Sequence, residues 1–518
     1  MPRQGNKEEF GEDAERRAGD TVDRAVRWLN TQSGKPYFLW VHLYDPHMPY
    51  KPPSPFKEKY KDRPYDGEIA YADQQLGRLL NAVEKKAPAG KTIMAVLSDH
   101  GESLSEHGEF SHGVFLYDAT LHIAFIMAGP GFPAGVRIKQ QVRSIDFLPT
   151  VLAVLGGKTP TNIQGLSLVP AFSGKTVPTE ISYEETLYPK LAMGWAELRG
   201  IRTNHWKYIR APKPELYNLN QDPGEATNVI QQHPAEVQRF EAQLKNVVGN
   251  GGSEKVETNM VDERQMAQLR SLGYLSGFSP QHYDLNGTGA DPKDRVAILK
   301  LLYEAENPAT NMPEARRIAL LKQALHEDPT DPSLYHQAGG ELEKVGRYDD
   351  ALHLYETALQ HGVENGRLHS RIADLELRRG DKDRAIAEYE KAARFDPSDF
   401  DSQTNLATAY LEKGRVADAE RVFNFVVASD SDNPAANNGL GLVSIQKHDL
   451  NTARDHFEKA VHLDPDLVEA QMNLGLIYEM TGDRAQARAH FETFLAKASR
   501  TQYANIIPKV KQELATLQ

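Results

Sequence analysis

Residues 92–117 read TIMAVLSDHGESLSEHGEFSHGVFLY, and this stretch decides how the first half of the chain folds. It opens with the apolar run 93–97, which is short and sharply bounded, as is typical of a buried strand. Asp99 and His100 follow directly, and the loop after them carries two more histidines. Ligands of open α/β sheets bind just past the carboxyl ends of strands. Carboxylate oxygen and imidazole nitrogen both bind divalent metals, so the stretch predicts a metal site in preference to a solvated loop.

A second strand is predicted upstream, at residues 37–43, and a Pro-rich loop with His47 follows it. Helical spacing of apolar residues over 66–85 separates the two strands. This strand–helix–strand order is typical of a parallel sheet. His42 lies inside the predicted strand, where we expect it to be packed. His47 and Asp99 would then meet on one edge of the sheet.

The rest of the first half continues as a mixed α/β sequence. Apolar spacing predicts a helix at 8–29, a strand at 123–128, a strand and a helix within 142–155, a hairpin after residue 200 and a helix at 235–248. We therefore assign residues 1–250 to one α/β domain. Residues 251–297 are largely Gly-rich and polar and predict a linker.

The second half is a repeat of small and aromatic residues. Alanines recur every 34 residues, at Ala351, Ala385, Ala419, Ala453 and Ala487, and each is followed four residues later by Tyr or Phe. Such a period indicates helix–turn–helix units that stack into an all-α solenoid, and it resembles the tetratricopeptide repeat (TPR). We predict about six units over 298–501 and a polar capping helix at 502–518.

The composition excludes several kinds of chemistry. The chain of 518 residues has no cysteine, so disulfides, Cys-ligated zinc and a Cys nucleophile are excluded. Its 72 acidic residues outnumber 60 Lys and Arg, which argues against nucleic acid as a partner. It has neither a His-Glu-x-x-His motif nor a Gly-rich nucleotide loop after a strand. No run of about 18 apolar residues predicts a membrane span, and the first 20 residues lack the apolar core of a signal peptide.

Five segments are similar, in order, to the later part of a sulfatase-family hydrolase of the alkaline phosphatase superfamily. They are FLWVHLYDPHMPY (38–50), YDGEIAYADQQLG (65–77), AVLSDHGESLSEHGEFSHGVFLYDAT (95–120), VRSIDFLPTVL (142–152) and ELYNLNQDPGEATN (215–228). The resemblance implies an α/β domain around a mostly parallel sheet, represented here by its later part and followed by the TPR solenoid.

The resemblance also implies roles for individual residues. Asp99 and His100 stand where the family places its second pair of metal ligands. Sulfatases usually have Asp-Asn there, and a histidine favours Mn or Zn over Ca. His47 matches the histidine that contacts the ester oxygens or leaving group, where an imidazole offsets developing charge. His112 lies near the family's residue that binds the sulfuryl or phosphoryl group. We assign His107 and the neighbouring glutamates to loop structure.

Two parts of the family's site have no counterpart in this sequence. The family uses an early metal-binding Asp motif and a Cys, Ser or Thr nucleophile, which in sulfatases lies in Cys/Ser-x-Pro-x-Arg. No such motif occurs here. We therefore assign no nucleophile and expect this chain, as given, to be inactive as a sulfate or phosphate ester hydrolase. The alternative is a TPR scaffold that binds a peptide or protein in its groove and carries a non-catalytic sulfatase remnant.

Two further expectations follow. As written, the sequence predicts a cytoplasmic protein, although members of the family are commonly exported. Parallel strands need neighbours on both sides, so we also expect residues 1–250, made alone, to be marginally stable or prone to aggregate.

Overall fold

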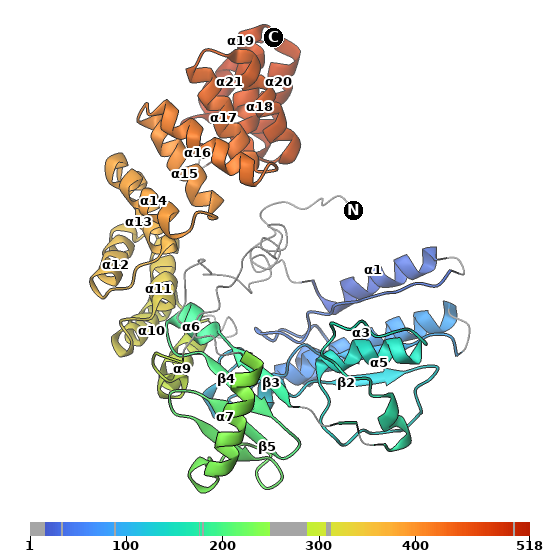
Figure 1. Cartoon of the computed structure of the whole chain (residues 1–518). Coiled ribbons are helices and arrows are strands. Elements are labelled where there is room, and N and C mark those ends of the chain that lie inside the picture. The colour runs from blue at the N-terminus through green and yellow to red at the C-terminus, as the bar shows by residue number, and fades with distance from the viewer. Residues whose placement is uncertain are drawn as a thin grey trace. The chain divides into compact units, whose positions relative to one another are not determined.

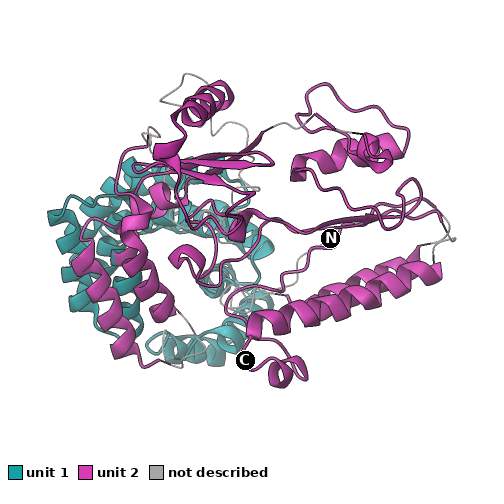
Figure 2. Ribbon diagram, turned by 90° about the horizontal axis from the view of Figure 1, so that it is seen from below, with its two compact units in different colours: residues 1–6, 256–282, 335–518 teal, residues 7–255, 283–334 magenta. Residues whose placement is uncertain are grey.

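A computed structural model describes residues 16–32, 35–86, 90–175, 177–178, 181–248, 287–306, 312–500 and 503–517. By their contacts the described residues form two compact units (Figure 2). One unit holds the described residues up to 248 together with 287–334, and the other holds 335–517. The predicted linker lies for the most part outside the described residues.

Two long helices build the first layer of the α/β unit. Helix α1 (Ala18–Thr31) packs along α3 (Pro64–Lys86), and a short α2 (Phe56–Lys59) precedes α3 (Figure 1). The cluster between them is apolar and comprises Val22, Ala25, Leu29, Leu79 and Val83. Both predicted helices are therefore present, although residues 8–15 of the first lie outside the described part.

The strands next to this layer are antiparallel, which corrects the expected parallel pairing. Strand β1 (Met94–Leu97) pairs with β2 (Phe125–Ala128) in antiparallel register, and the two form a two-stranded sheet. Residues 37–43 form no strand, because no described neighbour gives them a ladder of hydrogen bonds. They alternate as a strand would: Leu39, Val41 and Leu43 pack on the helices.

The opposite face of residues 37–43 is exposed. Phe38 is 85% and Trp40 81% exposed, and His42, which we expected to be packed, points the same way and is exposed. Ile126 on β2 is 63% exposed as well, but it pairs with Val96 and therefore shares the face of Met94, which packs on the helices. Residues 37–43 thus have one packed face and one exposed face.

A second sheet forms the other half of the α/β unit. It is an antiparallel meander of β3 (Ser182–Thr186), β4 (Leu198–Arg202), β5 (Trp206–Arg210) and β6 (Glu215–Asn218). Helix α7 (Pro234–Val248) buries Phe240 and Leu244 against it. The hairpin after residue 200 and the helix at 235–248 are confirmed.

Short elements join the two sheets. They are η3 (Glu106–Gly108), α4 (Asp118–Leu121), η4 (Ser144–Asp146), α5 (Phe147–Val154), η5 (Val169–Ser173), α6 (Tyr188–Met193) and η6 (Ile230–Gln232). The helix predicted within 142–155 is present as α5. The strand predicted before it is wrong, because the side chain of Asp146 caps a 3-10 turn there by accepting the backbone N–H of Arg143.

The first helical hairpin belongs to the α/β unit. It consists of η8 (Pro292–Arg295), α9 (Val296–Glu306) and α10 (Glu314–Glu327). Trp195 is buried and donates its Nε1–H to Asp328 Oδ2 over 2.9 Å. The backbone N–H of Lys213 donates to Asp291 Oδ2 over 2.8 Å. These contacts fix the hairpin on the second sheet.

The repeats form hairpins whose first helices begin 34 residues apart. These pairs are α11 (Pro332–Lys344) and α12 (Tyr348–Gln360), α13 (Gly366–Arg379) and α14 (Lys382–Phe395), α15 (Phe400–Glu412) and α16 (Val416–Ser429), α17 (Pro434–Gln446) and α18 (Leu450–Leu463), and α19 (Val468–Thr481) and α20 (Arg484–Lys497). The last helix is α21 (Ile507–Thr516). The five alanines of the repeat are fully buried, and the ring that follows each alanine packs beside it.

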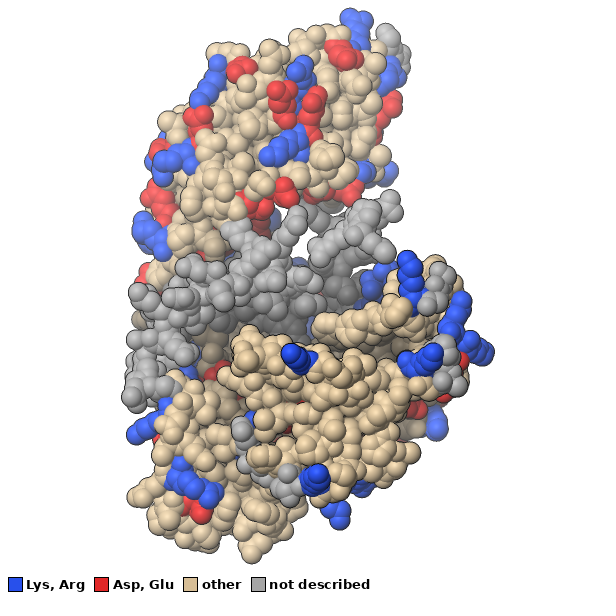
Figure 3. Space-filling view, turned by 45° about the vertical axis from the view of Figure 1, so that its right-hand side comes forward, with Lys and Arg blue, Asp and Glu red and all other residues tan. Residues whose placement is uncertain are grey.

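Charged side chains of both signs cover the repeats. Blue and red side chains alternate over the helical part in Figure 3, and several pairs join neighbouring helices, such as Lys382 with Glu412 at 2.7 Å and Lys413 with Asp383 at 2.8 Å. Such exposed pairs contribute little each. Among the described helices, none combines the length and the apolar character that crossing a membrane requires.

Candidate active site

The structure brings three of the singled-out histidines together. The rings of His100 and His112 lie 3.9 Å apart between centroids, and the rings of His47 and His112 lie 5.9 Å apart. They come from three chain segments: the loop after residues 37–43, the end of β1 and the loop before α4. The resulting cluster sits past the carboxyl end of β1, where the sequence predicted a site.

Asp99 and His100 lie just past the end of β1. The His100 Nδ1–H donates to the carbonyl oxygen of Gly101 over 2.7 Å, which leaves Nε2 as the free lone pair. A histidine whose second nitrogen is fixed in this way is oriented for a metal. Asp99 Oδ2 lies 3.8 Å from that Nε2, and its side chain is 64% exposed.

His112 is held by a buried carboxylate. Its Nδ1 lies 3.2 Å from Glu102 Oε1, and the Glu102 side chain is almost fully buried. Burial by itself lowers the pKa of His112, but the hydrogen bond and the charge of Glu102 outweigh it and raise that pKa above its usual 6.5. Tyr50 faces the same carboxylate, and burial together with the charge of Glu102 raises the pKa of its hydroxyl. Glu102 was assigned to loop structure from the sequence, and the structure instead places it against a candidate site residue.

The loop that carries His47 is held by two further carboxylates. Glu68 of α3 accepts the backbone N–H of His47 over 3.0 Å and that of Lys51 over 2.7 Å. Asp45 accepts the backbone N–H of Ala18, at the start of α1, over 2.6 Å. The His47 Nδ1–H donates to the carbonyl oxygen of Met48 over 2.6 Å. Sequence reasoning missed Glu68 because it occupies an ordinary position in an amphipathic helix.

His107 and Glu109 shape the loop and do not join the cluster. His107 stacks on Tyr117 at 3.6 Å, and burial lowers its pKa. Glu109 accepts the backbone N–H of Val114 over 2.7 Å and that of Phe115 over 3.3 Å. Burial raises the pKa of Glu109 to about 7, although both amides oppose the shift. The structure thus gives both residues contacts within the loop.

The loop before His112 also rests on the first helical hairpin. The rings of Phe110 and Tyr303 of α9 stack at 4.6 Å, nearly parallel at 16°. Gly108 has a positive φ of 82°, and a Cβ there would lie 2.3 Å from Val296 of α9. Only glycine fits this position without displacing the helix.

The residues present can supply part of a metal site. Asp99 and His100 offer one carboxylate and one imidazole, a donor set that suits Mn²⁺ or Zn²⁺. In the part of the chain that the structure describes, no three His, Asp or Glu side chains are arranged to hold a metal ion together. The described residues therefore offer two candidate donors and no complete metal site.

The chain carries a sulfatase-type α/β domain and a TPR domain, which confirms the resemblance drawn from the motifs. Residues 3–157 match the family Sulfatase, and residues 105–251 match the family "N-sulphoglucosamine sulphohydrolase, C-terminal". Residues 337–400, 404–467 and 445–502 match the family Tetratricopeptide repeat.

Curated relatives include arylsulfatase K of Xenopus laevis, 33% identical over 201 residues, and of Homo sapiens, 32% identical over 198 residues. Each alignment covers 36% of this chain and 36% of the relative, so the chain spans about a third of the length of these relatives. Among solved structures, the sulfatase-type yidJ of Bacteroides fragilis is 22% identical with a TM-score of 0.40, covering 45% of this chain and 58% of that one. The TPR protein YrrB is 22% identical with a TM-score of 0.30, covering 34% and 88%.

Proposed function

We propose that the α/β unit is the ester-binding part of a metal-dependent sulfatase-family hydrolase, and that the repeats bind a protein partner. The observation that supports the first part most directly is the cluster of His47, His100 and His112 beside Asp99. Three imidazoles on one rim, one of them beside a buried carboxylate that favours its cationic form, suit a sulfuryl or phosphoryl group.

Each residue has its own role in this proposal. His112, whose cationic form Glu102 favours, binds an ester oxygen, and His47 hydrogen-bonds the leaving-group side. Asp99 and His100 are two ligands of a divalent ion, which would offset negative charge on the ester when bound. Mn²⁺, Zn²⁺ and Ca²⁺ are the candidates, and the histidine favours the first two.

We assign no nucleophile to the described residues, and we expect this chain to bind an ester analogue without turning over an ester. The test is hydrolysis of p-nitrophenyl sulfate and p-nitrophenyl phosphate with added Mn²⁺, Zn²⁺ or Ca²⁺. The expected rate equals that of the metal alone. Turnover that both His47→Ala and Asp99→Ala abolish would contradict the expectation of inactivity, although it would support the assignment of the site.

A second candidate function is that of a TPR binding protein with a non-catalytic α/β part. A specific feature of the repeats favours a binding role, namely a hollow among α14, α15 and α16. Loss of a partner on deleting residues 335–518 would support this role, and unchanged binding would count against it.

A further inference from the structure

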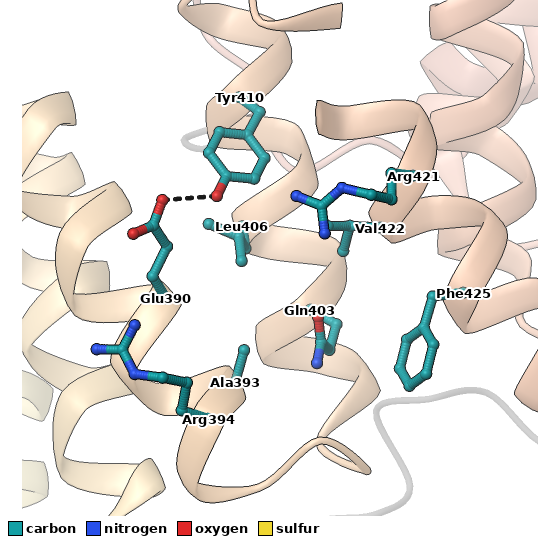
Figure 4. Close-up of a pocket in the computed structure, with 9 residues that line it drawn as sticks. All are labelled: Glu390, Ala393, Arg394, Gln403, Leu406, Tyr410, Arg421, Val422 and Phe425. Carbon is teal, nitrogen blue, oxygen red and sulfur yellow. Dashed lines mark hydrogen bonds between the residues drawn. The ribbon is translucent and has the colours of Figure 1, made fainter. Parts of the chain in front are cut away.

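The helical unit contains a hollow between two neighbouring repeats. The hollow has a volume of about 340 Å³ and is lined by α14, α15 and α16 (Figure 4). Its floor is apolar, with Leu406, Val422 and Ala393, and Phe425 stands at its edge, 45% exposed. The volume lies at the lower end of the roughly 300–1,000 Å³ of ligand clefts.

In two other repeats a polar bridge joins the equivalent positions. His369 Nδ1 lies 2.6 Å from Glu388 Oε2 in the preceding repeat, and Gln471 Oε1 accepts from His490 Nδ1 over 2.7 Å two repeats later. Gln403 is the equivalent of His369 and Gln471, 34 and 68 residues away. Val422 occupies the position equivalent to Glu388 and His490, and its side chain cannot form a hydrogen bond. The bridge is therefore missing here, and among the described residues it is also missing between Asn437 and His456 of the next repeat.

The rim of this hollow also departs from the repeat pattern. Arg394 replaces Gln360, Ala428 and His462 of the other repeats, and Arg421 replaces Ala387, Asp455 and Ala489. Phe425 replaces Lys391, Lys459 and Thr493. These changes gather two arginines and an aromatic ring around one apolar floor.

The local charges favour an anionic partner. Glu390 is engaged, since its Oε1 accepts the Tyr410 hydroxyl over 2.7 Å and lies 3.9 Å from Arg415. Asp418 is shared by Arg415 at 2.8 Å and Arg421 at 3.3 Å. Among the described residues Arg394 forms no ion pair. The lining of the hollow thus has two cations, Arg394 and Arg421, and one carboxylate, Glu390, and the two arginines stand on opposite sides of the floor (Figure 4).

We infer that this hollow binds a peptide segment of a protein partner, in which an apolar side chain of leucine size is flanked by aspartate or glutamate. The apolar side chain fills the floor beside Phe425, and the carboxylates pair with Arg394 and Arg421. Arginine suits carboxylates because its planar fork matches their geometry. The inference rests on the proposed partner-binding role of the repeats and gives it a place and a chemistry.

The test uses the full-length chain and a fluorescein-labelled peptide, Gly-Gly-Asp-Asp-Leu-Asp-Asp-Gly-Gly-Ser. We expect saturable anisotropy that weakens with added salt. Replacing the leucine by serine, or the aspartates by asparagines, should each weaken binding at least about tenfold, which corresponds to roughly 1.4 kcal/mol. No binding by the unchanged chain, or equal binding of all three peptides, would overturn the inference.

The protein variants restore what other repeats carry at the same positions, so the fold already accommodates them. Val422→His rebuilds the bridge to Gln403, Phe425→Lys copies Lys391, and the double change Arg394→Gln with Arg421→Ala removes the cations. Each should reduce affinity at least about tenfold. Arg484→Ala, an exposed arginine outside the hollow, is the matched control and should change affinity less than twofold.

Circular dichroism melts separate lost binding from lost folding. Val422→His should keep the melting temperature of the unchanged chain while losing the peptide. Unchanged affinity in this variant would overturn the inference, because the hollow would then not be the binding place. Failure of the hydrolase proposal would leave this test untouched, since none of these substitutions lies in the α/β unit.

Discussion

Lys207 shows how single residues set the stability of the α/β unit. Its side chain is completely buried, and its Nζ lies 2.9 Å from Asp118, 3.2 Å from Glu225 and 3.5 Å from Glu184. Burial opposes the charge, but the three carboxylates outweigh it and raise the pKa of Lys207. A buried cation with several anionic partners is costly to remove, since the anions remain buried without it.

We predict that Lys207→Met destabilises the chain by roughly 3–5 kcal/mol. Chemical denaturation followed by tryptophan fluorescence measures this difference. Lys245→Met, at an exposed position of α7, serves as the control and should shift stability by less than about 0.5 kcal/mol. A small decrease in the free energy of unfolding of Lys207→Met would contradict this prediction and show that water reaches the three carboxylates.

Glu109 gives the α/β unit a pH dependence whose sign can be stated. Burial raises the pKa of Glu109 from 4.5 to about 7, so the folded state holds a proton that the unfolded state loses between these values. This residue therefore contributes a loss of stability as pH rises from about 4.5 to 7. Glu109→Gln should make the melting temperature less dependent on pH over that range than it is in the unchanged chain. Glu84→Gln, at an exposed position of α3, should leave the pH dependence of the melting temperature unchanged.

At the scale of elements, the sequence predicted helices better than strand pairing. Helices α1, α3 and α7 and the 34-residue hairpins follow from apolar spacing within each segment, which is local information. The partner of a strand is not local. Residues 37–43 have a strand's alternation but no hydrogen-bonded neighbour among the described residues. Strand β1 pairs with β2 in antiparallel register, whereas the sequence analysis predicted a mostly parallel sheet.

The candidate site was predictable only in part for the same reason. His47, Asp99, His100 and His112 stand out because they follow predicted strands or recur in one loop. Glu102 and Glu68 do not, because a buried carboxylate looks the same in sequence as an exposed one. Their roles depend on which distant segment they meet: Glu68 contacts a loop 21 residues earlier.

Helix α9 supports the loop that carries His112, and this contact can be tested. Tyr303→Ala removes the ring that stacks on Phe110, a contact worth about 0.5–1.5 kcal/mol beyond the buried area. We expect faster amide hydrogen exchange in residues 102–113 of the variant, measured by mass spectrometry. Tyr348→Ala, which changes a ring on α12 in the other unit, should leave that exchange unchanged. Equal exchange in both variants would mean that α9 does not stabilise the loop.

At the scale of the whole molecule, the main feature is a set of exposed apolar side chains in the α/β unit. Phe38, Trp40 and Ile126 are largely exposed, and Leu155 after α5 is 67% exposed. Exposed apolar side chains of this kind promote association. We predict that residues 1–250 made alone aggregate, or melt broadly, and that Phe38→Ser with Trp40→Ser increases the soluble fraction. A sharp two-state melt of that unchanged segment would contradict the prediction.

The central claim is that His47, His100 and His112 form one site for a sulfate or phosphate group. Histidine-selective NMR of the full chain, titrated with sodium sulfate at constant ionic strength, tests it most directly. We predict that the ring signals of His47 and His112 shift together and saturate, whereas that of exposed His353 in the repeats does not move. Signals that follow only the ionic strength, or that shift equally at His353, would contradict the claim.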